Sequence, residues 1–472
     1  MKTIFLNIIF ILSCFIIQAQ KKLTLQQAIQ MGITNNIDVN QSDLLSQKAN
    51  ITLKQSKAAM LPNLNATANQ GINQGRTNDP ITNAFINQNI NYSSYGASSS
   101  VVLFNGSSLQ NNIKANALGY EASKMELQQA KDNLTINIIL AYLNVLSAED
   151  ILANSRNQQV VTSKQVDRLN TLNQSGAIPP SQYYDLKGQY ANDQITVVDN
   201  QSALETAKLD LSQLLNIPYD KSMDVERLPD DAFNIGYVAE PDKIYDTALQ
   251  QFAQVKAVHF RTESAQKNIR AIQGQLYPTL LLSGNIGTNY SSALTQSLFV
   301  NSVDVPSATD YVVVNGSQVP VITKQNNYNT QKVTYNNQLS NNLASGVNLG
   351  LSIPIFNGSQ VRSRVKLAKI DLKNNELVEQ NTKTVLQQSI ERAYVNLTNT
   401  SDKYKILLDQ VQSFTESFRA AEIRFNSGAI TSVDYLIAKN NLDKTNTNLI
   451  ISKYDFVLRA KILDYYQGKV LW

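Results

Sequence analysis

The sequence predicts a mostly helical chain made of two copies of one unit, with long helical hairpins and four β-strands that contribute to a transmembrane barrel. Three observations support this prediction. Apolar side chains recur every seven residues in two long proline-free regions, and they alternate every two residues in four short ones. The 472 residues are 43% hydrophobic but only 17% charged. The polar character therefore comes from Asn, Gln, Ser and Thr, unlike that of a charged disordered tail.

Residues 1–19 predict a secretory signal peptide. Lys2 precedes an apolar run over residues 4–17, and the small Ala19 follows it. Cleavage there would remove Cys14, the single cysteine, whereas lipidation of Cys14 is the alternative. No later stretch reaches the ~18 uninterrupted apolar residues that a membrane-spanning helix needs. A membrane crossing by the mature chain would therefore have to use strands.

Residue counts exclude several classes of function. The formal net charge of +4 is small, which argues against a nucleic-acid partner. One cysteine and one histidine, His259, cannot form a Cys/His metal cluster or a catalytic dyad. His259 has no counterpart in the first copy, where Asp43 stands, and we expect a surface or packed side chain. The sequence predicts no enzyme, no cofactor and no resident metal.

The chain contains an internal duplication. A shift of 252 residues aligns 104–107 (FNGS) with 356–359 and 175–178 (SGAI) with 427–430. Upstream the shift is 216, so the second copy carries an insertion of 36 residues (252 − 216). Two copies are too few for a solenoid. We expect a first repeat at 20–216, a proline-containing connector at 217–241 and a second repeat at 242–472.

Each copy predicts a long helix followed by a shorter returning one. Residues 106–176 and 358–428 contain no proline inside the segment and can run as helices of ~100 Å. Gly176 and Gly428 then mark the turn of an αα-hairpin. The seven-residue step predicts helices that pack as a coiled coil. Polar residues at second seam positions, such as Asp193, suggest helices side by side in a wall with one wet face. The heptad positions of the returning helices are Tyr183, Tyr190, Val197, Leu204 and Leu211, with Tyr435, Leu442, Leu449, Phe456 and Leu463 in the second copy.

Two-residue alternation predicts four strands, each with one apolar and one small polar face. This is the pattern of a strand between lipid and a water-filled lumen. Four strands cannot enclose water, and eight is the practical minimum. We therefore expect an oligomer, and three chains with twelve strands leave an obvious lumen. The polar residues 291–342 suggest a long extracellular loop. The expected strands are at about 62–73, 92–104, 279–290 and 343–356.

This organisation resembles that of the TolC-like outer-membrane efflux family. The matching motifs are Pro62 and Pro278 before the first strand of each copy, Phe-Asn-Gly at the strand-to-helix junction, and 424–428 (RFNSG). The resemblance, through the order, spacing and repetition of these motifs, covers essentially the whole mature chain. The resemblance implies a homotrimer with a 12-stranded barrel in the outer membrane of a Gram-negative bacterium and a 12-helix tunnel across the periplasm. It also implies docking of a periplasmic adaptor (membrane fusion) protein and an inner-membrane pump, for export of drugs or ions.

By this resemblance, functional residues lie at the two hairpin tips. Gly176 and Ala177, with Gly428 and Ala429, match the small residues that adaptor hairpins contact. A small side chain lets another helix approach the backbone closely. The alternative is that each glycine only ends its helix.

Asp434 matches a position where family members project a carboxylate into the aperture. Threefold symmetry would make a ring of like charges, which draws cations and raises the pKa of its members; the alternative is a solvated surface aspartate. Ile437 stands where a second ring carboxylate can occur, and Gln182, the first-copy equivalent of Asp434, is uncharged. Ile430 replaces a basic latch residue, and Phe425 replaces a bridging tyrosine. Apolar contacts would then take the place of a polar latch.

Two other functions stay open. A type I secretion outlet for polypeptides would use the same passive duct. A periplasmic coiled-coil scaffold without a pore would use the helices, but it leaves the four alternating strands unexplained.

Overall fold

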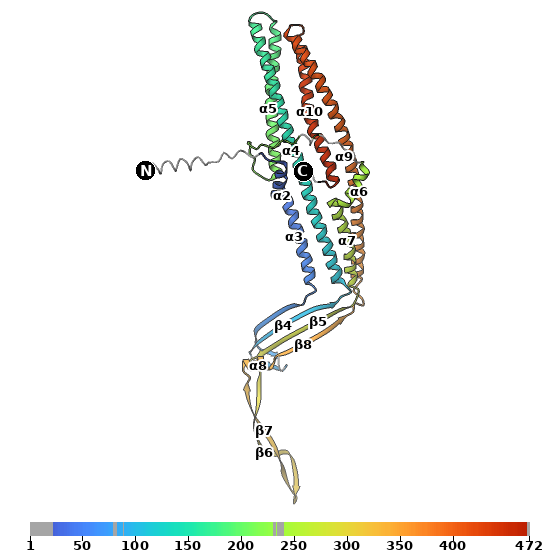
Figure 1. The fold of residues 1–472 in the computed structure, drawn as a ribbon. Coiled ribbons are helices and arrows are strands. Elements are labelled where there is room, and N and C mark those ends of the chain that lie inside the picture. The colour runs from blue at the N-terminus through green and yellow to red at the C-terminus, as the bar shows by residue number, and fades with distance from the viewer. Residues whose placement is uncertain (1–21, 79–82, 88, 230–232, 234–239, 470–472) are drawn as a thin grey trace, which may run out of the picture. The chain divides into compact units, whose positions relative to one another are not determined.

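The computed structural model describes residues 22–78, 83–87, 89–229, 233 and 240–469 (Figure 1). The predicted signal peptide, Cys14 and part of the predicted connector lie outside these residues. The chain divides into a helical unit and a sheet unit. The helical unit comprises Met1–Leu53, Ala115–Gln266 and Lys369–Trp472, and the sheet unit comprises Lys54–Lys114 and Lys267–Ala368.

Long helices dominate the described chain, as the heptads predict. α4 and α9 are 67 residues long each, and they are followed by returning helices α5 and α10 of 36 and 35 residues. Figure 1 shows α4 with α5, and α9 with α10, as two hairpins. The duplicated helical hairpins of the predicted fold class are therefore present. The helices are α2 (Leu25–Asn35), α3 (Ile37–Ala58), α4 (Ser108–Gln174), α5 (Pro180–Leu215), α6 (Pro241–Gln251), α7 (Ala253–Gly274), α9 (Gln360–Asn426) and α10 (Ser432–Tyr466).

The core of the helical unit is built on these apolar seams. Tyr142 of α4 is fully buried. Its hydroxyl lies within hydrogen-bond distance of two carbonyl oxygens, those of Leu23 (2.8 Å) and Glu226 (2.7 Å), and donates to them. α4 has the length and apolar composition of a membrane-spanning helix, but 44% of its most apolar window is buried inside the protein. The buried side chains of α4, among them Ile138, Ile139 and Tyr142, belong to the core of the helical unit. The composition of α4 thus reflects packing against other helices.

Several polar side chains at the second seam positions are buried, although a solvent-exposed face was expected there. Asp193 is buried, and so are Thr445 and Ser452 at seam positions of α10. A buried polar side chain needs a hydrogen-bond partner. Thr445 donates to the carbonyl oxygen of Asn441 at 2.8 Å, and Asp193 lies in a charged network described below. The Ser452 hydroxyl has no hydrogen-bond partner among the described residues. These positions lie inside the helix packing and not on a wet face.

The sheet unit contains a four-stranded antiparallel sheet in the order β1-β4-β5-β8. Its register puts apolar and polar positions on opposite faces. One cross-strand row is Leu64, Ser99, Gly284 and Val347, and the next, on the other face, is Asn63, Ser100, Ser283 and Asn348. The four strands, at the sites of the two-residue alternation, are β1 (Asn63–Asn73), β4 (Ile90–Phe104), β5 (Thr279–Ser291) and β8 (Ala344–Ser352).

The segment expected as a long loop is mostly a β-hairpin. β6 (Thr295–Val314) and β7 (Ser317–Lys332) pair antiparallel, and α8 (Tyr335–Asn341) follows. Asn315 and Gly316 between the strands have φ of 48° and 83°, as a tight hairpin turn requires. Both strands are almost wholly exposed, and their apolar side chains, such as Val313 and Ile322, lie at the surface. A shorter ribbon joins β2 (Arg76–Asn78) and β3 (Phe85–Asn87).

Candidate functional site at the hairpin tips

Both hairpins turn on a glycine in the same conformation. Gly176 has φ +72° and Gly428 has φ +74°. The Ala177 amide donates to the Leu172 carbonyl at 2.9 Å, and the Ala429 amide donates to the Arg424 carbonyl at 2.8 Å. This pattern is the Schellman motif, which satisfies the last carbonyls of a helix. A Cβ added at either glycine would meet no atom within 4 Å, so only the backbone conformation calls for glycine.

The returning helices begin differently. α5 begins at Pro180, and its N-cap residue, Pro179, has no capping side chain. α10 begins with a capping box, in which the Asp434 amide donates to the Thr431 hydroxyl oxygen at 3.2 Å. The Thr431 hydroxyl and amide donate in return to the Asp434 carboxylate at 2.8 and 3.2 Å. These bonds, the hydroxyl first, hold the Asp434 pKa below its ordinary value within one chain.

An apolar cluster joins the two hairpins below the tips. The ring of Phe425 is buried and stacks on that of Tyr435, with 4.7 Å between centroids. Leu169 of α4 and Leu186 of α5 pack into the same cluster, with Ile430 at its edge. Burial raises the pKa of the Tyr435 hydroxyl, which has no hydrogen-bond partner among the described residues. The apolar contacts expected of Phe425 and Ile430 are present within one chain.

Polar bonds also join the hairpins, beyond the apolar contact expected. The Arg168 guanidinium donates to the Asn426 carbonyl oxygen at 2.7 Å and also to the Asn426 side-chain oxygen. The Ser432 hydroxyl donates to the Asp185 carboxylate at 2.7 Å. All of these residues lie within a few turns of the glycines.

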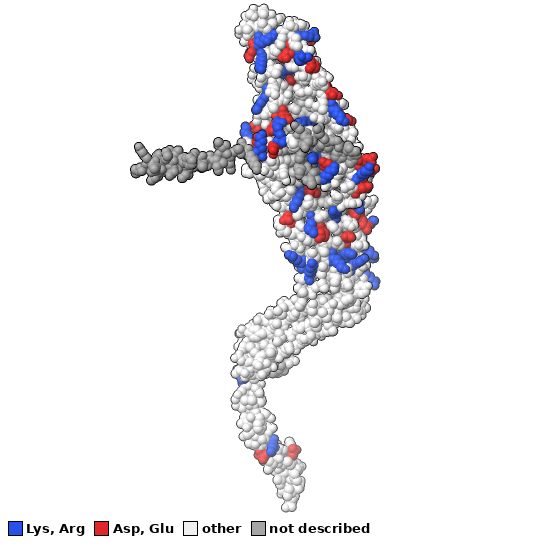
Figure 2. Space-filling model, in the orientation of Figure 1, with Lys and Arg blue, Asp and Glu red and all other residues white. Residues whose placement is uncertain are grey.

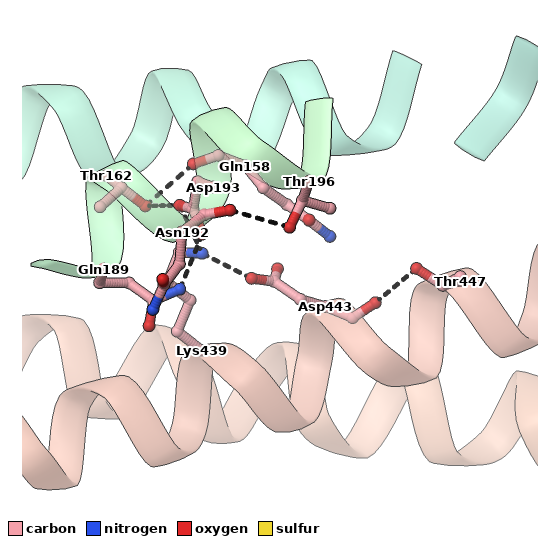
Figure 3. A network of polar contacts seen from close by, with 9 residues as sticks. All are labelled: Gln158, Thr162, Gln189, Asn192, Asp193, Thr196, Lys439, Asp443 and Thr447. Carbon is pink, nitrogen blue, oxygen red and sulfur yellow. Dashed lines mark hydrogen bonds and ion pairs between the residues drawn. The ribbon is translucent and has the colours of Figure 1, made fainter. Parts of the chain in front are cut away.

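A buried ion network that the sequence analysis missed lies further along the hairpins (Figure 3). The Lys439 ammonium is 3.2 Å from the carboxylate of Asp193 and 2.6 Å from that of Asp443. Only 2% of the Lys439 side chain is exposed. Gln189 and Thr162 also donate to Asp193. Because Lys439 belongs to α10 and Asp193 to α5, the network links the hairpins. Burial raises the Asp443 pKa, although Lys439 opposes this.

The remaining predicted aperture residues are not brought into these contacts. Ile437 is 56% exposed on α10, and Gln182 is half-buried on α5. Asp434 itself is exposed. In a single chain, the tip glycines and alanines are exposed, and so are Asp434 and Ile437, whereas Phe425 is buried.

No group of three or more His, Cys, Asp or Glu suitable for a metal occurs in the described part of the chain. His259 is exposed, and its Nδ1 lies 3.3 Å from a Glu379 carboxylate oxygen. An exposed imidazole beside a carboxylate is an ordinary surface contact.

The sequence model of the family described as "Outer membrane efflux protein" matches residues 28–216 and 244–463. The chain belongs to this family. It is 24% identical over 438 residues to outer membrane protein TolC of Vibrio cholerae, covering 90% of this chain and 87% of that protein. It is 22% identical over 338 residues to TolC of Escherichia coli, covering 70% of this chain and 60% of that relative's length.

Solved structures of two further proteins share the fold. The structure of CusC matches with a TM-score of 0.76 and 16% identity, covering 97% of this chain and 94% of that one. VceC of Vibrio cholerae matches with a TM-score of 0.74 and 14% identity, covering 95% and 97%. As a member of this family, the chain is a non-enzymatic transport protein of the outer membrane of Gram-negative bacteria.

Proposed function

We propose that three copies of this chain form a passive duct that exports small molecules, drugs or ions. Four strands from each copy make one 12-stranded barrel in the outer membrane. The paired helices α4, α5, α9 and α10 of each copy make a 12-helix tunnel across the periplasm. A periplasmic adaptor docks at the hairpin tips, and an inner-membrane pump supplies the energy.

The observation that carries this proposal is the open four-stranded sheet. β1 and β8 lie at its two ends, and neither pairs with a further described strand on its outer side. Unpaired backbone groups are very unfavourable in lipid, so membrane sheets close into barrels. Pairing β8 of one copy with β1 of the next satisfies every edge. The apolar row with Leu64 and Val347 then faces lipid, and the row with Asn63 and Asn348 faces water.

Two measurements on protein extracted from outer membranes test the duct. Native mass spectrometry should give an assembly of three chains, and planar bilayers should show discrete ion conductance. A water-soluble monomer with its sheet folded against its own helices would overturn the proposal. Helical circular dichroism without heat-resistant sheet would favour the scaffold instead.

The tip glycines are proposed to contact the adaptor as well as to end their helices. Asparagine tolerates φ near +60° but adds a side chain, so Gly176→Asn with Gly428→Asn separates the two roles. Export should be lost while the trimer and its thermal stability persist. Gly188→Asn is the matched control, because a Cβ there also meets no atom within 4 Å. Export retained in the double variant would leave the glycines as helix ends only, and loss of the trimer would make them folding residues.

Asp434 is proposed to line the aperture. Asp434→Asn keeps an oxygen for the Thr431 donors but removes the charge, so cation selectivity should fall. The reversal potential across a salt gradient in planar bilayers measures this selectivity. Asp409→Asn, an exposed change elsewhere on α9, should have no effect. Unchanged selectivity in Asp434→Asn would place this carboxylate away from the pore.

A further inference from the structure

The helix ends of the sheet unit carry a group of basic side chains. They lie in the turns of α3, α4, α7 and α9 that adjoin the four strands. Figure 2 shows basic side chains gathered over these helix ends, beside strands that carry no charge. We call this set the cationic collar. Its members are Lys54, Lys57, Lys114, Lys267, Arg270, Arg362, Arg364 and Lys366.

The collar has no acidic partner within its unit. The carboxylates of the described sheet unit are Asp304 and Asp310, and both are on the β6–β7 hairpin, where Asp304 faces Lys324. No collar side chain forms an ion pair with another described residue. The ion pairs found in the described chain all belong to the helical unit. The collar side chains are therefore not held in ion pairs with described carboxylates.

The collar is also accessible and recurs in both copies. Seven of its side chains are exposed, and Lys267 is half-buried. The shift of 216 aligns Lys54 with Arg270, and the shift of 252 aligns Lys114 with Lys366. The strands β1, β4, β5 and β8, in contrast, contain no Lys, Arg, Asp or Glu. A boundary between uncharged strand and cationic helix thus repeats at each of the four connections.

We infer that the collar binds the anionic headgroups of phospholipids in the periplasmic leaflet of the outer membrane. Uncharged strands suit the hydrocarbon layer, and the next layer along the membrane normal is that of the headgroup phosphates. Lys and Arg beside a membrane-spanning segment are attracted to anionic lipid. Their long aliphatic stems let the charges reach the phosphates while the helices stay at the surface. The inference rests on the proposed function only in that the sheet spans the membrane.

Native mass spectrometry of the intact detergent-solubilised assembly tests the collar. Phosphatidylglycerol is the anionic probe, and phosphatidylcholine is the zwitterionic control. The wild-type protein should retain phosphatidylglycerol more tightly, and sodium chloride should weaken this binding. The variant Arg362→Gln, Arg364→Gln, Lys366→Gln should bind it more weakly, by roughly fivefold per neutralised side chain.

The charge-matched control is Lys164→Gln, Lys403→Gln, Lys444→Gln, which neutralises exposed lysines of the helical unit. It should bind phosphatidylglycerol as the wild-type protein does. Equal retention of the two lipids by the wild-type protein, or equal losses in the two triple variants, would overturn the inference. So would unchanged lipid binding with altered ion selectivity, because the collar would then line the lumen.

Channel conductance of the same samples separates this inference from the proposed duct. A conducting wild-type trimer without lipid preference overturns the collar alone, whereas a protein that neither assembles nor conducts overturns the duct. If the collar variant does not assemble, the lipid preference and salt dependence of the wild-type protein decide the matter.

Discussion

The two helical hairpins have turns of the same conformation but differ in how the returning helix begins after the turn. Gly176 and Gly428 have the same left-handed conformation and equivalent capping bonds. The first hairpin restarts at Pro180 without a side-chain cap, whereas the second restarts with the bonds between Thr431 and Asp434. The backbone turn is thus common to the two copies, while the helix start is solved by different side chains.

The two hairpins contribute different side chains to the contact between them. Lys439 of the second hairpin is buried between carboxylates, whereas Lys187, its equivalent at the shift of 252, is exposed. Asp193 supplies a buried carboxylate, while Thr445 stands at its equivalent position. The lysine is therefore common to both copies, but only Lys439 is buried, and Asp193, the carboxylate of the other hairpin that pairs with it, has an uncharged equivalent. Breaking each difference in turn tests how much the hairpins depend on it.

The largest effect is expected from Lys439→Met. It leaves the carboxylates of Asp193 and Asp443 buried without their cation, which destabilises a protein by ~3–5 kcal/mol. The thermal unfolding midpoint of the helical circular dichroism signal should fall accordingly. Lys187→Met, the same change at the equivalent position, should shift the midpoint little. Equal shifts in the two variants would show that the buried network does not stabilise the hairpins.

The same network predicts a pH dependence. Burial raises the Asp443 pKa above its ordinary value of 3.8, so the folded state binds that proton more tightly than the unfolded state. The Asp443 contribution to stability therefore rises as pH falls from the raised value towards 3.8. Removing Lys439 raises this pKa further, so the stability loss of Lys439→Met should shrink in acid. Asp443→Asn should reduce that recovery, because Asp193 then remains as the other buried carboxylate, and a loss independent of pH would contradict the assignment.

The long helices and the four-stranded sheet could be predicted because their signals are local. A seven-residue step identifies α4 and α9, and a two-residue step identifies strands whose register then sorts the faces. The β6–β7 hairpin was missed although β-branched and aromatic residues flank its Asn-Gly turn, at 311–314 (YVVV) and 319–323 (VPVIT). Neither strand has a buried face, so the search for one apolar and one polar face did not find it. Lys439 could not be paired with Asp193 from sequence, because the two lie 246 residues apart. From sequence alone, an aspartate at a seam position can be either exposed to solvent or buried in an ion pair.

An intermediate effect is expected at the shared turn. Gly176→Ala and Gly428→Ala each force a Cβ into the left-handed region, which costs about 1–2 kcal/mol. The free space around both glycines means that no clash adds to this cost. The two variants should therefore lower the unfolding midpoint equally. Unequal shifts would contradict this expectation. They would indicate that the two turns have different surroundings in the assembly, as when another chain covers one of them.

The smallest effects are expected at the helix starts. Thr431→Ala removes the hydroxyl oxygen that accepts a hydrogen bond from the Asp434 amide, and loss of such a cap lowers the free energy of unfolding by about 1 kcal/mol. Pro180→Ala only increases the freedom of the unfolded chain, which costs about 0.5 kcal/mol. Thr431→Ala should therefore lower the midpoint more than Pro180→Ala, and Thr431→Ser should restore it because serine keeps the hydroxyl. The loss should also be constant above the ordinary carboxyl pKa, since the Asp434 pKa is lowered and its charge persists there. A larger loss in Pro180→Ala would mean that the first hairpin depends on the rigidity of its proline more than the second depends on its capping box.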